Sequence, residues 1–173
     1  MTSTSKIAAG AQFPSLPVPL VGGGTADLAA TGGWRLVIVY RGKHCPLCKK
    51  YFKGLSGMLD DLKAADVTVL AVSADPREKA EADVTAEGWQ FPVGYDLSLD
   101  QMRQLGLYIS EPRSPQETDR PFPEPGLFVI NPSGKIQIVD ISNAPFARPD
   151  LGSILAGIKL IRERDYPIRG TLR

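Results

Sequence analysis

The chain has 173 residues, 43% of them hydrophobic, with 20 Lys and Arg residues against 19 Asp and Glu residues. This composition is typical of a soluble globular protein, and we expect a single domain over residues 1–173. The balanced charge argues against a nucleic-acid-binding or membrane-surface protein, and no apolar stretch reaches the roughly 18 residues that span a membrane.

The N-terminal segment, residues 1–33, is rich in Gly, Pro, Ser and Thr. Its prolines favour an extended arm with short edge strands, since proline is tolerated at sheet edges but not in central strands. The segment lacks the apolar run of a secretory signal, so we expect a cytoplasmic location.

Residues 34–40 (WRLVIVY) form a near-continuous apolar run, which predicts a strand buried on both faces. From Cys45 onward the apolar residues recur at helical spacing, and Pro46 stands at the first helical position, where proline is favoured. We predict one helix that continues to about Ala65, although Gly54 and Gly57 each weaken it by about 1 kcal/mol relative to Ala.

A second buried strand is predicted at 67–73 (VTVLAVS). Asp75 is expected to be the N-cap of the next helix, which has Pro76 in its first turn and ends at Gly88. A short strand is expected within 91–94, and the sequence SLDQ at 98–101 resembles a capping box that opens a short helix.

The segment 107–125 contains five prolines and shows no periodicity, so we expect a loop. Residues 126–131 and 135–140 flank a Pro-Ser-Gly turn and predict a β-hairpin, and a last helix is expected to begin near Pro149. This order places the CxxC motif at the C-terminal end of the first central strand, where catalytic groups gather in open α/β sheets.

The only two cysteines, Cys45 and Cys48, stand beside the only histidine, His44. Cys45 is expected to cap the helix, where free backbone N–H groups and the helix dipole favour a thiolate. Arg41, Lys43 and His44 are expected to add positive charge. Because Cys48 lies one turn further, on the apolar side, it should stay protonated. This asymmetry predicts that Cys45 is the nucleophile and Cys48 the resolving thiol.

Two other interpretations of the cysteine pair remain. A zinc site needs three or four ligands, and the chain has no second CxxC and no further histidine to supply them. The cysteines could instead be small hydrophobic core residues, but this interpretation explains Cys48 alone better than it explains the pair. His44 is as compatible with a solvent-facing loop residue as with a role in tuning Cys45. No phosphate-loop or dinucleotide motif is present.

The buried strand followed by YRGKHCPLC resembles the thioredoxin-fold superfamily, and within it the alkyl hydroperoxide reductase/thiol-specific antioxidant (AhpC/TSA, peroxiredoxin-like) proteins with an RGxxCPxC motif. The stretches EGWQFPVGYD at 87–96 and GLFVINPSGK at 126–135 extend the resemblance over most of 10–160. It implies an α/β, thioredoxin-like fold: a central mixed β-sheet flanked by helices on both faces, with an N-terminal extension. It also implies an oxidoreductase with a Cys45/Cys48 redox pair and no metal or other cofactor.

The sequence departs from typical peroxiredoxins at two places. Neither cysteine has the Thr three positions before it and the Pro seven positions before it that the PxxxTxxC signature requires, and an ungapped comparison sets Cys48 at the peroxidatic position. Where typical peroxiredoxins have an arginine before the GLFII-like strand, this chain has Pro125, which resembles the cis-proline opposite the CxxC of thioredoxins. The family resemblance favours a hydroperoxide as the substrate, whereas these two departures favour a protein disulfide. We expect a hydroperoxide, with a protein disulfide as the alternative. A non-enzymatic redox sensor or metal-binding module is a third interpretation.

Peroxide reduction would need an activating arginine, and the sequence does not rank its candidates, although Arg41 is the nearest to the cysteines. The others are Arg113, Arg120 and Arg148. The resemblance further implies a thioredoxin- or glutaredoxin-like electron donor and is compatible with a homodimer. The 107–125 loop could be a lid over Cys45, a docking surface or a variable insertion.

Overall fold

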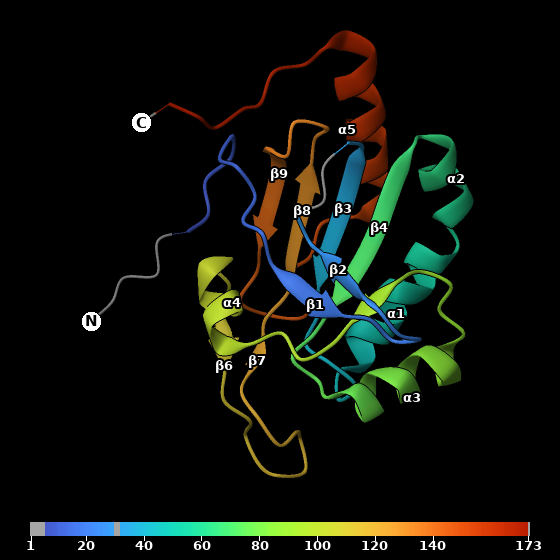
Figure 1. Ribbon diagram of the computed structural model, residues 1–173, viewed down its shortest axis with the longest axis vertical. Coiled ribbons are helices and arrows are strands. Elements are labelled where there is room, and N and C mark those ends of the chain that lie inside the picture. The colour runs from blue at the N-terminus through green and yellow to red at the C-terminus, as the bar shows by residue number, and fades with distance from the viewer. Residues whose placement is uncertain (1–5, 30–31, 173) are drawn as a thin grey trace.

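The computed structural model describes residues 6–29 and 32–172. Its centre is a five-stranded mixed sheet with the strand order β5-β4-β3-β8-β9 (Figure 1). β3 (Trp34–Val39), β4 (Val67–Val72) and β5 (Val93–Gly94) are parallel to one another. β8 (Gly126–Ile130) runs antiparallel to β3, and β9 (Ile136–Ile141) runs antiparallel to β8. The predicted mixed sheet is therefore confirmed.

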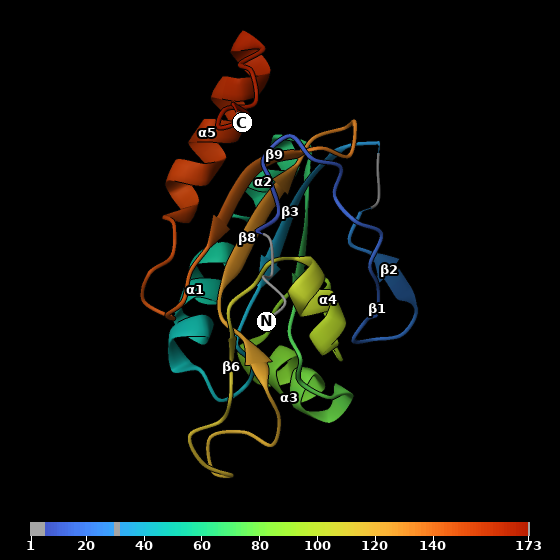
Figure 2. The ribbon, with the colours of Figure 1, turned by 90° about the vertical axis from the view of Figure 1, so that its left-hand side faces the viewer.

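Helices cover both faces of this sheet (Figure 2). One face carries α1 (Pro46–Ser56), α2 (Leu59–Ala64) and α5 (Leu151–Arg164). The other carries α4 (Leu99–Gln104) and a hairpin. The two strands of this hairpin are β1 (Pro17–Pro19) and β2 (Thr25–Asp27). This is the α/β arrangement that the sequence predicts. None of the helices in the described ranges is long and apolar enough to cross a membrane.

The alternation of side chains along β3 builds two separate cores, one on each face. Leu36 and Ile38 join the core beneath α1 and α5, whereas Val37 and Val39 join the core beneath α4 and the N-terminal hairpin. All four side chains are at most 2% exposed, because β3 is central in the sheet and covered on both faces. The turn that leaves β3 therefore starts from a rigid point.

The helix predicted to run from Pro46 to about Ala65 is in fact two helices. α1 ends at Ser56 with Gly57 as its C-cap, and α2 begins at Leu59. Because Gly57 has a low helix propensity, little opposes a break there. The partly buried Met58 packs against the core at this point, so the break keeps the apolar stripe directed inward.

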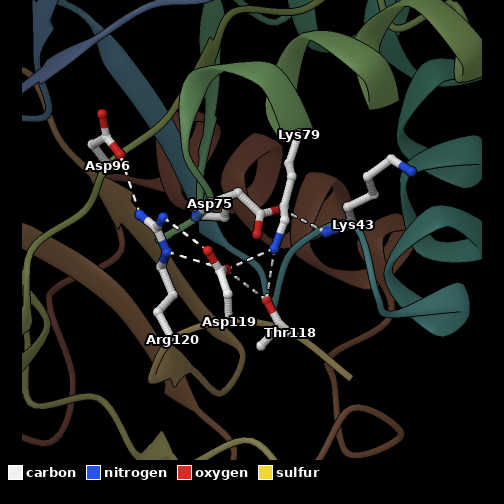
Figure 3. Close-up of polar contacts among 8 residues, drawn as sticks. Lys43, Asp75, Lys79, Asp96, Thr118, Asp119 and Arg120 are labelled. Atoms are coloured by element: carbon white, nitrogen blue, oxygen red, sulfur yellow. Dashed lines mark hydrogen bonds and ion pairs between the residues drawn. The ribbon is translucent and has the colours of Figure 1, made fainter. Parts of the chain in front are cut away.

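The predicted cap of the next helix is also wrong. α3 (Arg77–Glu87) begins at Arg77 with Pro76 as its N-cap, and no side chain caps it. The Asp75 carboxylate instead accepts a hydrogen bond from the backbone N–H of Lys43, at 2.6 Å (Figure 3). A partly buried N–H group in the turn after β3 therefore uses the carboxylate that the local sequence would otherwise place as the helix cap.

Other local signals in the sequence are confirmed. Ser98 and Gln101 form the predicted capping box of α4, and Gly88 ends α3 in a left-handed conformation. β8 and β9 form the predicted hairpin. The last helix begins at Leu151, two residues after the predicted start, because Asp150 caps it by accepting from the Ser153 N–H at 2.7 Å.

Two segments outside the five-stranded sheet are held by short backbone pairings. In the N-terminal segment, Gln12 bridges to Lys135 and Leu20 bridges to Gly94, so this segment passes from the β8–β9 turn to the β5 edge. Within 107–125, the sequence does not predict the pairing of β6 (Ile109–Ser110) with β7 (Phe122–Pro123). This pairing brings the two ends of the Pro-rich loop together.

We expect Phe52→Ala to destabilise the fold by about 3–5 kcal/mol, because it opens a cavity in a fully buried aromatic cluster. The Phe52 ring lies 4.9 Å from the rings of both Tyr40 and Trp89, and 5.3 Å from that of Phe91. Urea unfolding followed by tryptophan fluorescence measures the change. Phe146→Ala is the matched control: this ring is 81% exposed, so its removal should change stability by less than about 0.5 kcal/mol. Equal losses in the two variants would contradict the assigned core.

Candidate active site

The cysteine pair lies where β3 passes into α1. Cys45 has an extended backbone and is the N-cap of α1, as the sequence predicts, and Pro46 is the first helical residue. Its Sγ atom accepts a hydrogen bond from the Cys48 backbone N–H at 3.4 Å. Both cysteines are unpaired thiols, and each is only 1% exposed. The thiols therefore face one another at the positive end of the helix, shielded from water.

Arg148 contacts the pair from the segment between β9 and α5. Its Nη2 atom lies 2.8 Å from Cys48 Sγ and 4.0 Å from Cys45 Sγ. The guanidinium lies over the Tyr51 ring, 5.1 Å from the ring centroid, and the Tyr51 hydroxyl donates to the Pro149 carbonyl at 2.7 Å. Tyr51 thus holds both the side chain of Arg148 and the backbone beside it.

Arg41 approaches Cys45 from the turn after β3. Its Nε lies 3.1 Å from an Oε atom of Glu124, and its Nη2 lies 3.9 Å from one of Glu117. The guanidinium also lies over the Phe122 ring, 4.8 Å from its centroid. Interaction with this guanidinium lowers the pKa of the Cys45 thiol. The Pro-rich loop therefore supplies the two carboxylates and the aromatic ring that hold one of the arginines.

The pKa values of the two thiols are displaced in opposite directions. Hydrogen bonds from the Cys48 thiol and the Cys48 backbone N–H, together with Arg41 and Arg148, lower the pKa of Cys45 to about 5, although burial opposes this. Burial raises the pKa of Cys48, and so does its hydrogen bond to Cys45, while Arg148 acts against both. The pair therefore holds one proton at neutral pH, on Cys48, and leaves the negative charge on Cys45.

His44 does not add the positive charge that the sequence suggests. Burial lowers the pKa of His44 to about 4, and the nearby Arg41 charge lowers it further. The neutral ring packs edge-on against Phe122, with the ring centroids 4.5 Å apart. Within the described ranges neither ring nitrogen has a hydrogen-bond partner. Of the charges predicted around Cys45, those of the arginines are the ones that act on the thiol.

Pro125 lies beside the site, but its geometry differs from the expected one. It lines a small hollow together with Tyr51 and Arg148. No cis peptide bond occurs in the described part of the chain, so the comparison with a cis-proline is wrong. Pro125 joins β7 to β8, and its carbonyl accepts a hydrogen bond from the Ser142 N–H at 2.9 Å.

The other two candidate arginines do not reach the thiols. Arg113 pairs with Glu117. Arg120 pairs with Asp119 and Asp96 (Figure 3). Both arginines belong to the Pro-rich loop. Their partners Glu117 and Asp119 lie in the same loop, and Asp96 lies before α4. The structure thus brings together Cys45, Cys48, Arg41 and Arg148, and it leaves Arg113 and Arg120 outside.

Two further residues build the site without having been predicted from the sequence, Tyr51 and Glu124. Tyr51 follows Cys48 by three positions on α1, and this i, i+3 spacing is the signal that could have placed it beside the thiol. Glu124 precedes Pro125 and offers no such signal, because only the fold brings it to Arg41.

Among the described residues, no group of three or more His, Cys, Asp and Glu side chains is placed to hold a metal ion.

Comparison with known proteins identifies the family. The model of the AhpC/TSA family matches residues 9–139. Two proteins of Mycobacterium tuberculosis that carry the name peroxiredoxin are each 28% identical to this chain over 109 residues, which are 62% of this chain and 69% of the relative.

Solved structures share the fold at low sequence identity. The peroxidoxin BcpB of Mycobacterium tuberculosis has a TM-score of 0.75 at 18% identity, covering 90% of this chain and 99% of the other. A peroxiredoxin-like protein of Aquifex aeolicus has a TM-score of 0.77 at 16% identity, covering 91% and 89%. The peroxiredoxin 6 of Arenicola marina has a TM-score of 0.74 at 19% identity, covering 90% and 74%. The chain thus belongs to the AhpC/TSA family, and it is a thiol-dependent oxidoreductase of the peroxiredoxin-like type.

Proposed function

We propose that the protein reduces hydroperoxides, with Cys45 as the attacking thiolate and Cys48 as the resolving thiol. The opposite environments of the two sulfurs are the observation that carries this assignment. Cys45 accepts hydrogen bonds from the thiol and the backbone N–H of Cys48, whereas Cys48 lies one turn into the helix and retains its proton. The thiolate is the nucleophilic form of cysteine, so Cys45 is ready to react at neutral pH.

The proposed reaction has two steps. In the first, the Cys45 thiolate attacks one oxygen of the hydroperoxide, the O–O bond breaks, and the leaving alkoxide takes a proton to become an alcohol; Cys45 becomes a sulfenic acid. In the second, the Cys48 sulfur attacks the sulfenic sulfur of Cys45 as the S–O bond breaks; the Cys48 proton joins the departing hydroxide to form water, and the Cys45–Cys48 disulfide remains. Because the two residues lie within one turn of α1, the second step needs no large displacement of the chain.

Arg148 is the group that we assign to the leaving oxygen. Its Nε and Nη1 atoms are buried and have no hydrogen-bond partner in the described part of the chain, while Nη2 contacts Cys48. Two free donors beside the thiols can bind the peroxide oxygens and stabilise the charge that develops as the O–O bond breaks. Arg148 would thus supply, from another part of the chain, the guanidinium that is absent at Pro125.

The disulfide formed by each turnover has to be reduced by an external dithiol. We propose a thioredoxin- or glutaredoxin-like donor, because the exchange chemistry of a CxxC disulfide requires an attacking thiolate from a partner. A cytoplasmic location is proposed on the reasoning that an unpaired catalytic dithiol suits a reducing compartment. A homodimer is proposed by analogy with the family alone.

We predict that Cys45→Ser abolishes peroxide consumption, because it removes the nucleophile. Cys48→Ser should still perform one turnover, after which dimedone traps a sulfenic acid on Cys45. The measurement is consumption of H₂O₂ or cumene hydroperoxide with dithiothreitol, with mass spectrometry after one equivalent of oxidant. Dimedone found on Cys48 in the Cys45→Ser variant would instead assign the attack to Cys48. Wild-type turnover no faster than dithiothreitol alone, with insulin-disulfide reduction intact, would reject the peroxidase assignment.

The rate of peroxide reduction should be nearly constant from pH 7 to pH 8 and should fall in acid. The sign follows from the lowered pKa of Cys45: the thiolate persists above a pKa of about 5 and is lost as the pH falls through that value. Stopped-flow measurement of the first turnover between pH 4 and pH 8 gives the profile. A rate that instead rises tenfold per pH unit between pH 6 and pH 8 would show an ordinary thiol, titrating near 8.5.

Arg148→Ala is expected to lower the rate of the first step by about 10²–10³-fold, the typical loss when a charge-stabilising donor is removed. It should also raise the pKa of Cys45, because Arg148 is one of the groups that lower it. Arg162→Ala is the control, since this arginine is exposed in the last turn of α5. Equal rates in the two variants at pH 7 would remove Arg148 from the mechanism.

A further inference from the structure

A buried carboxylate from the neighbouring strand end holds the turn that carries Cys45. Asp75 follows β4 and is only 3% exposed. Its Oδ2 atom accepts the backbone N–H of Lys43 at 2.6 Å, two residues before the cysteine (Figure 3). The proposed reaction does not use this carboxylate, and the carboxylate does not cap α3, whose N-cap is Pro76.

The turn after β3 packs closely against the Asp75 carboxylate at Gly42. Gly42 has φ of +121°, a conformation that side chains other than glycine rarely adopt. A Cβ atom at this position would lie 2.7 Å and 2.8 Å from the two carboxylate oxygens of Asp75. Residue 42 therefore has to be glycine for two reasons, its backbone conformation and the approach of Asp75.

The same turn makes a hydrogen bond with the nucleophile itself. The carbonyl oxygen of Gly42 accepts the backbone N–H of Cys45 at 3.1 Å. Asp75 fixes the peptide N–H of Lys43, and the carbonyl of that same peptide unit belongs to Gly42. One rigid peptide plane thus joins the Asp75 carboxylate to the N–H of Cys45.

Asp75 is itself held independently of the turn. Its N–H donates to the Ser73 hydroxyl at 3.3 Å, and its carbonyl accepts from the Asp96 N–H at 2.9 Å. Burial raises the pKa of the Asp75 carboxyl, while the positive charges of Lys79 on α3 and Arg120 on the Pro-rich loop act against this. The negative charge of Asp83, also on α3, adds to the effect of burial.

We propose that Asp75 is a positioning residue for Cys45: it fixes the Gly42–Lys43 peptide and thereby sets the cysteine at the N-cap of α1. This rests on the proposed role of Cys45 as the nucleophile. The negative charge of Asp75 distinguishes a positional effect on the pKa of Cys45 from an electrostatic one. A carboxylate near a thiol raises the pKa of that thiol, so Asp75 can favour the thiolate only by placing it against the helix N-terminus and Arg41.

The test is the pH dependence of iodoacetamide alkylation at Cys45, located by mass spectrometry, in Asp75→Ala and Asp75→Asn. The Ala variant should raise the alkylation midpoint by roughly one unit, because the thiol loses part of its N-cap placement. The Asn variant should keep the wild-type midpoint, because its amide oxygen still accepts from Lys43. No peroxide is present, so failure of the peroxidase assignment would leave this result intact.

Two outcomes would overturn the proposal. A wild-type midpoint in Asp75→Ala would show that the turn does not need the clamp. A lowered midpoint in both variants would show that the charge of Asp75, rather than its geometry, acts on Cys45. Met102→Ala serves as the stability control, because Met102 is buried in the core on the opposite face of the sheet. This variant should lose stability without moving the midpoint.

Gly42→Ala tests the same clamp from the other side, and it carries the test if Asp75→Ala does not fold. It should raise the alkylation midpoint in the same direction, since its Cβ displaces the carboxylate. In the double variant Gly42→Ala/Asp75→Ala the shift should be smaller than the sum of the two single shifts, because both changes break one contact. Fully additive shifts would contradict a shared clamp.

Discussion

The constraint on which this site depends is the burial of a negatively charged sulfur. A thiolate that is only 1% exposed has lost nearly all its hydration, so the protein has to return that stabilisation through donors of its own. The donors come from separate parts of the chain: the first turn of α1, the turn after β3 and the segment before α5. β3 lies between β4 and β8, and Cys45 follows β3 as the N-cap of α1, so these parts of the chain meet at the thiolate.

Arg148 is the donor that needs most support from the rest of the fold. A buried guanidinium is costly unless its charge is met, and here the thiolate and the face of Tyr51 meet it. Tyr51 and Cys48 belong to α1, and Cys45 is its N-cap. Arg148 is therefore held by the same helix that carries the two thiols. Pro125 lines the same small hollow as Arg148 and Tyr51.

Sequence reasoning is accurate here where the signal is local, and it fails where a contact links distant segments. The helix cap at Cys45, the capping box at Ser98 and the β8–β9 hairpin all follow from neighbouring residues. Arg148 is 100 positions from Cys48, and no periodicity relates the two. Asp75 shows the failure most directly, because its position beside Pro76 is that of a local cap, while the fold gives its carboxylate to a turn 32 residues away.

The choice of arginine rather than histidine or lysine around Cys45 follows from the same burial. Histidine loses its charge when buried, and the lowered pKa of His44 leaves it neutral at pH 7 although it adjoins Cys45. Lys43 adjoins His44 but is exposed, where water screens its charge. A guanidinium stays charged in either setting and spreads several donors in one plane. Arg41 and Arg148 can therefore stabilise a buried thiolate at neutral pH. His44 could not replace them, because its imidazole carries no positive charge at that pH.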